Sequence, residues 1–232
     1  MRRLFLLIST TIAALFSSYD LKAEAPERQG WEKDFPLYGD VESVVMTEYK
    51  LEEKFGEVVR GGILGCHKFY FNDAGDVIEN AGYNPDGSLD GKRIYKYDSL
   101  GNKIEEAYYG SDGSLSEKFI YKYDSLGNKI EESYYGFDGS LRYKYIYKYD
   151  SSGNRIEWAR YNSDGSLDYK TIYKYDSSGN KIEWARYNSD GSLIMKHILK
   201  YDSSGNRIEA TEYRGEAITP ESQMVYEITY RN

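Results

Sequence analysis

The chain has 232 residues, and its 30 Lys and Arg against 38 Asp and Glu give a formal net charge of −8 at pH 7. An acidic chain without a basic stripe is unsuited to nucleic acid or anionic lipid, which excludes both as partners. Tyrosine supplies 26 residues of the 40% hydrophobic set, so we do not expect a conventional aliphatic core. Cys66 is the single cysteine, which excludes an intrachain disulfide.

Residues 1–25 have the pattern of a secretory signal peptide. Two arginines precede the apolar run Leu4–Phe16, and an Ala-x-Ala site ends at Ala25. The apolar run is too short for a membrane-spanning helix, although an uncleaved anchor is the alternative. Cleavage removes three positive and two negative charges, which changes the net charge from −8 to −9. We expect an exported protein of bacterial type (periplasmic, on the cell surface or secreted) with no membrane span after cleavage.

Residues 26–37 are polar and aperiodic, and we interpret them as a linker. Residues 38–68 are expected to form N-terminal capping strands around a turn at Lys54–Glu57. Gly61–Gly62 predicts a bend or bulge there. The two strands are expected at Val41–Tyr49 and Val58–Ile63.

Residues 69–213 contain six copies of a 26-residue unit. Equivalent positions are held by Phe69, Tyr95, Tyr121, Tyr147, Tyr173 and Leu199. The first copy is degenerate and the last loses its second turn, as the ends of a repeat array require. Residues 214–232 are interpreted as a loop and a closing strand at Val225–Tyr230.

Each unit carries two turn signals half a period apart, such as Asp150–Asn154 and Asp164–Leu167. Gly supplies positive φ, while Asp, Asn and Ser side chains bond to the nearby backbone. The segments between the turns are rich in Tyr, Ile, Trp and Thr, which favour strands. The pattern predicts an all-β chain of tandem hairpins, a twisted or curled meander of roughly 14 strands about 4.8 Å apart.

The charges predict the register of each hairpin. A four-residue loop at Ser177–Asn180 places Lys174 opposite Glu183, and a slip by one residue would send every side chain to the other face. The same register pairs Lys96 with Glu105, Lys122 with Glu131, Lys148 with Glu157 and Lys200 with Glu209. One face is then expected to carry Leu167, Tyr173, Tyr175 and Ile182, and the other Ile172, Ala185 and Tyr187.

The motif Tyr-x-Tyr-Asp-x-x-Gly-Asn occurs as YKYDSLGN at 95 and 121 and as YKYDSSGN at 147 and 173. Over about residues 69–209 it resembles the YD repeats of the Rhs/YD-repeat family. That resemblance implies β-hairpin repeats that coil into a shell, often with a toxin or adhesive domain. The array here is short and no effector domain follows it in the sequence, so we do not expect a toxin-carrying role. The Asp-Gly-Ser-Leu turns are more weakly similar to MORN-type hairpin repeats. Both resemblances imply interaction and scaffolding.

No enzyme motif stands out, and we expect no catalytic residues, no metal and no cofactor. Cys66 and His67 are adjacent, so on a strand they point to opposite faces, which is wrong for a nucleophile and its base. We interpret Cys66 as a small buried apolar residue. The Asp-x-x-Gly-Asn loops lack the alternating ligands of a calcium loop, and turn chemistry alone explains them.

The candidate binding site is aromatic. The middle units have Trp158 and Trp184 where other units have Glu106, Glu132 and Ala210, and each Trp precedes an arginine by two residues. On the predicted register these residues share a face with several tyrosines, a surface suited to sugar rings or a protein partner. The candidate residues are Trp158, Arg160, Trp184, Arg186, Tyr143, Tyr145 and Tyr169.

The sequence therefore predicts a non-catalytic interaction or adhesion module that binds a glycan or protein through this patch. Two alternatives stay open. The aromatic residues would pave the sheet by cross-strand pairing alone, or the array would be a structural envelope component that self-associates through its terminal strands.

Overall fold

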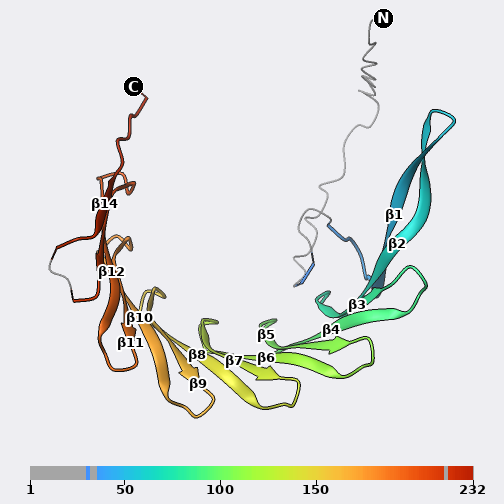
Figure 1. Cartoon of the computed structure of the whole chain (residues 1–232), viewed down its shortest axis with the longest axis horizontal. Helices are drawn as coiled ribbons and strands as arrows, with labels where there is room; N and C mark the ends of the chain where they lie inside the picture. Colours follow the sequence, from blue (N-terminus) through green and yellow to red (C-terminus); the bar gives the residue numbers. More distant parts are fainter. Residues whose placement is uncertain (1–29, 32–35, 217–218, 232) are drawn as a thin grey trace, which may run out of the picture.

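Figure 1 shows the computed structural model, which describes residues 30–31, 36–216 and 219–231. Within these residues the chain forms one antiparallel sheet of 14 strands, in which strands adjacent in sequence are neighbours. The sheet bends into an open crescent whose two ends stay apart (Figure 1). This confirms the predicted all-β meander. The predicted signal peptide, residues 1–25, lies outside the described residues.

From Val77 to Arg214 the strands begin at positions that repeat every 26 residues. The strands are β1 (Ser43–Lys54), β2 (Glu57–Phe71), β3 (Val77–Tyr83), β4 (Leu89–Tyr97), β5 (Lys103–Gly110), β6 (Leu115–Tyr123), β7 (Lys129–Gly136), β8 (Leu141–Tyr149), β9 (Arg155–Asn162), β10 (Leu167–Tyr175), β11 (Lys181–Asn188), β12 (Leu193–Tyr201), β13 (Arg207–Arg214) and β14 (Ser222–Val225). Among the described residues there is no helix long and apolar enough to cross a membrane.

Both turn types of the unit share one backbone geometry. In the first, Gly153 N donates to Asp150 O, Asp150 N donates to Asn154 O, and Gly153 has φ +82°. In the second, Gly165 and Asn162 repeat this pattern. This is a three-residue loop made of a type I turn and a left-handed glycine. The Asp150 carboxylate also accepts from the side chain and backbone N–H of Asn154, and these bonds lower its pKa.

The predicted four-residue loop at Ser177–Asn180 is wrong, but the register derived from it is right. Asp176 pairs with Asn180 across a three-residue loop, and a bulge before Glu183 restores the alignment. Lys174 therefore faces Glu183 as predicted, with Nζ 2.8 Å from Oε1. The other predicted Lys–Glu pairs also form, between Lys96 and Glu105, Lys122 and Glu131, Lys148 and Glu157, and Lys200 and Glu209.

A similar bulge corrects one face assignment. Leu167 pairs with Tyr161, whereas the register has shifted before Tyr169 pairs with Arg160. Asp168 is the extra residue. Directly opposite residues share a face, so Leu167 lies on the face of Tyr161 and not, as predicted, on that of Tyr173.

The sheet is a single layer, so burial comes from neighbours on the same face. One repeat position is consistently small and almost fully covered: Ala81, Ala107, Ser133, Ala159, Ala185 and Thr211 are between 1% and 6% exposed. Ala185, for example, lies between Ile172 and Lys196 on the flanking strands. The lysines at this level extend over tyrosine rings, as Lys196 does over Tyr213 at 4.7 Å. Long amphipathic side chains thus cover the small stripe with their aliphatic stems.

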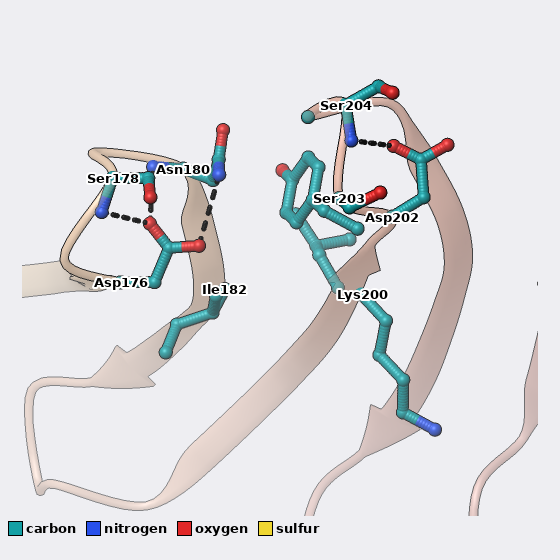
Figure 2. Close-up of a pocket in the computed structure, with 11 residues that line it drawn as sticks. Asp176, Ser178, Asn180, Ile182, Lys200, Asp202, Ser203 and Ser204 are labelled. Carbon is teal, nitrogen blue, oxygen red and sulfur yellow. Dashed lines mark hydrogen bonds between the residues drawn. The ribbon is translucent and has the colours of Figure 1, made fainter.

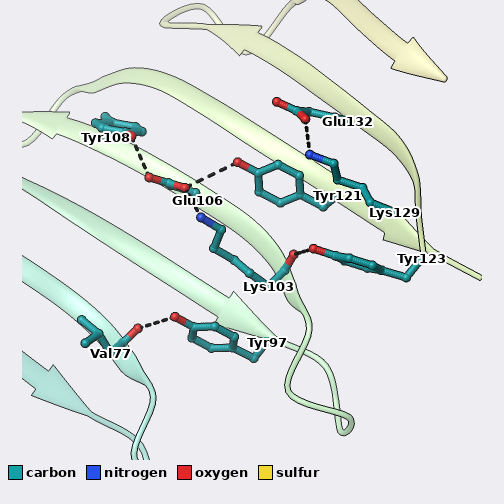
Figure 3. A network of polar contacts seen from close by, with 9 residues as sticks. All are labelled: Val77, Tyr97, Lys103, Glu106, Tyr108, Tyr121, Tyr123, Lys129 and Glu132. Carbon is teal, nitrogen blue, oxygen red and sulfur yellow. Dashed lines mark hydrogen bonds and ion pairs between the residues drawn. The ribbon is translucent and has the colours of Figure 1, made fainter. Parts of the chain in front are cut away.

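The tyrosine of each Tyr-Asp motif bridges successive hairpins. Pairing of β5 with β6 ends at Glu105 and Ile120, and beyond it the hydroxyl of Tyr123 donates to the carbonyl oxygen of Lys103 at 2.9 Å (Figure 3). The same bond, across 20 residues, recurs in the described chain from Tyr97, Tyr149, Tyr175 and Tyr201 to Val77, Lys129, Arg155 and Lys181. Burial is the main cause that raises the pKa of Tyr123. We call these bonds tyrosine bridges.

Grooves lie between successive Asp-Asn turns, where the strands have parted. One, of about 590 Å³, lies between the turns that begin at Asp176 and Asp202 (Figure 2). Ile182 and Tyr201 are among the residues that line it. Comparable grooves of about 490 and 560 Å³ occur beside the turns at Asp150 and Asp98.

The N-terminal end carries an arm that extends past the rest of the sheet (Figure 1). The predicted turn forms at Phe55 and Gly56, and the predicted bulge forms where Gly61–Gly62 passes the partner strand. Pairing of β2 with β3 begins only at Cys66, so the arm beyond it is a two-stranded ribbon. Trp31 packs edge-on against Phe69 at 5.0 Å.

At the other end, the closing strand lies earlier than predicted. The prediction was Val225–Tyr230, whereas β14 is Ser222–Val225, paired with β13. After β14, Tyr226 N donates to the carbonyl oxygen of Ile208 at 2.9 Å, and the hydroxyls of Tyr226 and Tyr230 contact Arg207 and Asp202.

We predict that Tyr149→Phe destabilises the fold by about 1 kcal/mol, because the bonded carbonyl of Lys129 loses its donor while the ring is kept. Urea unfolding followed by circular dichroism measures this. Tyr187→Phe is the matched control, because the Tyr187 hydroxyl makes no hydrogen bond within the described residues. Equal stability of the two variants would contradict a role for the bridge.

Candidate binding face

The candidate residues occupy alternate positions on β8 to β11, so their side chains project from one face. Tyr145 pairs with Arg160, and Trp158 pairs with Thr171. On that face a continuous row of rings crosses the strands, with successive centroids 4.9 to 6.1 Å apart. We call this row the aromatic ladder; its members are Tyr108, Phe119, Tyr134, Tyr143, Tyr145, Trp158 and Tyr169.

The ladder contacts are tilted or edge-on. The Tyr145 and Trp158 rings are inclined by 54°, and Trp158 meets Tyr169 at 86°. Such arrangements suit the ring quadrupole, and they contribute roughly 0.5–1.5 kcal/mol per pair beyond burial. The ladder therefore helps to hold the sheet together as well as presenting a surface.

Two arginines lie over rings of the ladder. The Arg160 guanidinium is 4.4 Å from the Tyr143 centroid, and it forms an ion pair with Asp168. The Arg186 guanidinium lies 5.2 Å from the Tyr169 centroid and 5.7 Å from that of Trp158. Both distances are within the range of cation–π attraction.

Trp184 is not part of the ladder. Its ring stacks on His197 at 4.2 Å with an interplanar angle of 11°. Thr171, which is only 1% exposed, stands where the preceding unit has Tyr145 and so interrupts the row of rings. The structure thus separates the two tryptophans that the sequence grouped together.

Sequence reasoning missed several aromatic neighbours of the site. Phe119 and His197 occupy the repeat position of Tyr145, and Tyr108 and Tyr134 occupy that of Arg160. The period itself would have identified them. The exposure of the patch was also overestimated, because all seven candidate residues are half-buried by neighbours on the same face.

At the repeat position of Trp158, two earlier units carry glutamates beside the ladder, Glu106 and Glu132. Glu106, which is 8% exposed, accepts hydrogen bonds from Lys103 Nζ at 2.5 Å and from the Tyr108 hydroxyl at 2.6 Å (Figure 3). Burial acts against ionisation, yet these bonds keep the Glu106 pKa below its ordinary value. Burial, together with the bond to Glu106, raises the pKa of Tyr108 to about 12. Glu132 repeats the arrangement with Lys129.

Cys66 and His67 are both among the residues that line a groove of about 510 Å³ at β1 to β3. His67 Nδ1 lies 3.2 Å from Asn80 Oδ1, and Cys66 makes no hydrogen bond to His67 within the described residues. Cys66 is half-buried, not buried as predicted. In the part of the chain that the structure describes, no group of three or more His, Cys, Asp or Glu residues could hold a metal ion.

Residues 161–212 match the model of a family described as a protein of unknown function, DUF2963. No curated protein matches the chain.

Among solved structures, a TcdB2–TccC3 crystal structure without the hypervariable C-terminal region is 12% identical, with a TM-score of 0.42 over 80% of this chain and 11% of that one. A Photorhabdus luminescens Tc holotoxin pore is 11% identical, with a TM-score of 0.30 over 79% of this chain and 14% of that one. A porin-like protein from Bacteroides uniformis is 10% identical, with a TM-score of 0.30 over 74% and 88%. The chain spans about a tenth of the TcdB2–TccC3 length. These scores carry no inference about function.

We predict that Glu106→Gln lowers the unfolding free energy at neutral pH by about 1–3 kcal/mol, because hydrogen bonds to a charged group are lost. The folded-state pKa lies below the ordinary value of 4.5, so this contribution is present above that pH. It disappears as the pH falls through the folded-state pKa. Denaturant unfolding across pH measures it.

The matched control is Glu157→Gln, whose partner Lys148 is 59% exposed, so that solvent screens the pair. A Glu106→Gln effect that is independent of pH, or no larger than that of the control, would contradict this account.

Proposed function

We propose that the protein is an exported, non-catalytic binding module that takes an extended carbohydrate along its aromatic ladder. The observation that carries this proposal is the continuity of the ladder across β5 to β10 on one face of a single-layer sheet.

The physical chemistry of the rings favours sugar. The face of an aromatic ring is electron-rich, so it attracts the polarised C–H groups of a pyranose. The ladder crosses five strand spacings, which is about 24 Å at the usual separation between strands. This length matches an oligosaccharide and exceeds that of a single sugar. Its rings are half-buried, so each keeps exposed surface while its neighbours fix its orientation. Such preorganisation reduces the entropy lost on binding.

Two parts of this proposal, export and the lack of catalysis, are inferred from the sequence. The signal-peptide pattern of residues 1–25 supports export, and the resemblance to the Rhs/YD-repeat family supports an adhesive or scaffolding role over catalysis.

The N-terminal arm favours a second candidate function, self-association. Large apolar side chains on this two-stranded ribbon are exposed, among them Leu51 at 66%, Val58 at 71% and Phe55 at its tip. In the described sheet β1 has one neighbouring strand, and an unpaired edge is a template for another strand. If a second copy pairs antiparallel about Tyr49, Glu48 faces Lys50 of that copy, which gives a favourable charge pairing.

We predict that Trp158→Ala weakens binding to a glycan identified on an array by about tenfold or more, since it removes a central ring from the ladder. Calorimetry measures the affinity, and circular dichroism checks the fold. Tyr187→Ala, on the opposite face, is the control and should bind as the wild type does. Unchanged binding by Trp158→Ala, or loss of its fold, would assign the ladder a purely structural role.

For self-association, we predict concentration-dependent dimers in sedimentation velocity that Leu51→Lys abolishes, because a charge on the apolar arm opposes burial. Leu126→Lys, at an 80% exposed position in a remote turn, controls for the same change of charge. A wild type that is monomeric at every concentration would contradict this second function.

A further inference from the structure

The two arginines of the aromatic face are equivalent by repeat but differ in their electrostatic surroundings. Arg160 lies over Tyr143, and Arg186 lies over Tyr169, one period later. The second arginine also lies beside Trp158, where the unit before has Glu132. Their backbones occupy the same register in the sheet.

The difference lies at the bulge of the next strand. Asp168 is the bulged residue of β10, and its carboxylate pairs with Arg160. The equivalent bulge of β12 falls between Leu193 and Met195, so that Ile194 takes the place of Asp168. Arg160 is therefore neutralised by its own hairpin, whereas an aliphatic side chain stands beside Arg186.

Within the described residues, Arg186 has no carboxylate partner. Its Nε donates a long hydrogen bond of 3.4 Å to the Thr171 hydroxyl. The acids of the neighbouring strands are engaged elsewhere: Glu183 pairs with Lys174 on the opposite face, and Glu212 contacts Arg214 and His197. A cation on a half-buried aromatic surface is thus left without a counter-charge in the fold.

The remaining donors of Arg186 suit an anion with two oxygens. A guanidinium has N–H donors arranged in a fork, and a carboxylate or sulfate can accept two of them in parallel. The guanidinium lies 5.7 Å from the Trp158 centroid and 5.2 Å from that of Tyr169, and these cation–π contacts help to keep it in place.

We propose that Arg186 is an anion subsite at the end of the aromatic ladder, and that the ligand is an acidic oligosaccharide whose carboxylate or sulfate group binds this guanidinium. This inference rests on the proposed carbohydrate-binding function and specifies its substrate class. Sugar rings stack along the ladder, and the acidic substituent selects the position next to Trp158. Arg160, paired with Asp168, provides no such selection.

The test is a glycan array that carries neutral, uronic acid or sialic acid, and sulfated oligosaccharides, followed by calorimetry with the best neutral and acidic probes. The wild type should prefer acidic probes by about tenfold, the effect of one charge-assisted contact. Arg186→Gln should lose this preference. Ile194→Asp should do the same, because it supplies the counter-charge that Asp168 gives to Arg160.

Lys174→Gln is the matched control, because it removes one positive charge from the exposed opposite face. It should keep the full preference. The carboxylate and sulfate probes distinguish the two sources of the anion. Equal binding of neutral and acidic probes by the wild type, or an unchanged preference in Ile194→Asp, would overturn the subsite and leave the carbohydrate function standing. An array on which no probe binds would overturn both.

Discussion

The hydrogen bond from a tyrosine hydroxyl to the backbone carbonyl 20 residues earlier is the interaction on which this architecture depends. Where the backbone ladder between successive hairpins ends, at Glu105 and Ile120 for instance, the strands part and the hydroxyl spans the gap. A single-layer sheet has no second layer to hold such an opening. The tyrosine bridge allows the sheet to bend, because the backbone carbonyl still receives a hydrogen bond. The grooves beside the Asp-Asn turns are the spaces between the parted strands.

The same constraint leaves both faces of the sheet available. One face uses its side chains to cover a stripe of small residues such as Ala159 and Ala185. The other varies along an unchanging backbone, from the Glu106 and Glu132 networks to the aromatic ladder around Trp158. Turns, bridges and Lys–Glu pairs recur along the array, whereas the residues of the second face differ from unit to unit.

Local chemistry explains what could be predicted from the sequence. The period, the hairpins, the Lys174–Glu183 register and the common face of Trp158 and Tyr145 follow from turn residues and neighbouring charges. The loop length was wrong because a three-residue loop and a bulge produce the same register as a four-residue loop. The tyrosine bridges could not be predicted, since their acceptor is backbone and leaves no signature in the side chains. The separation of Trp184 from the ladder could have been read from the period, since Thr171 stands where the preceding unit has Tyr145.

An alkaline titration of tyrosinate absorbance, followed together with circular dichroism, tests the tyrosine bridges most directly. Burial raises the pKa of Tyr97, Tyr123, Tyr149 and Tyr175 above the ordinary value of 10.0. The neutral hydroxyls therefore stabilise the fold below pH 10, and this stability is lost as the pH rises towards their folded-state pKa values. We expect the bridging hydroxyls of Tyr97, Tyr123, Tyr149 and Tyr175 to ionise only above pH 10, together with loss of the sheet. Ionisation of all tyrosines near pH 10 with the sheet intact would contradict the account.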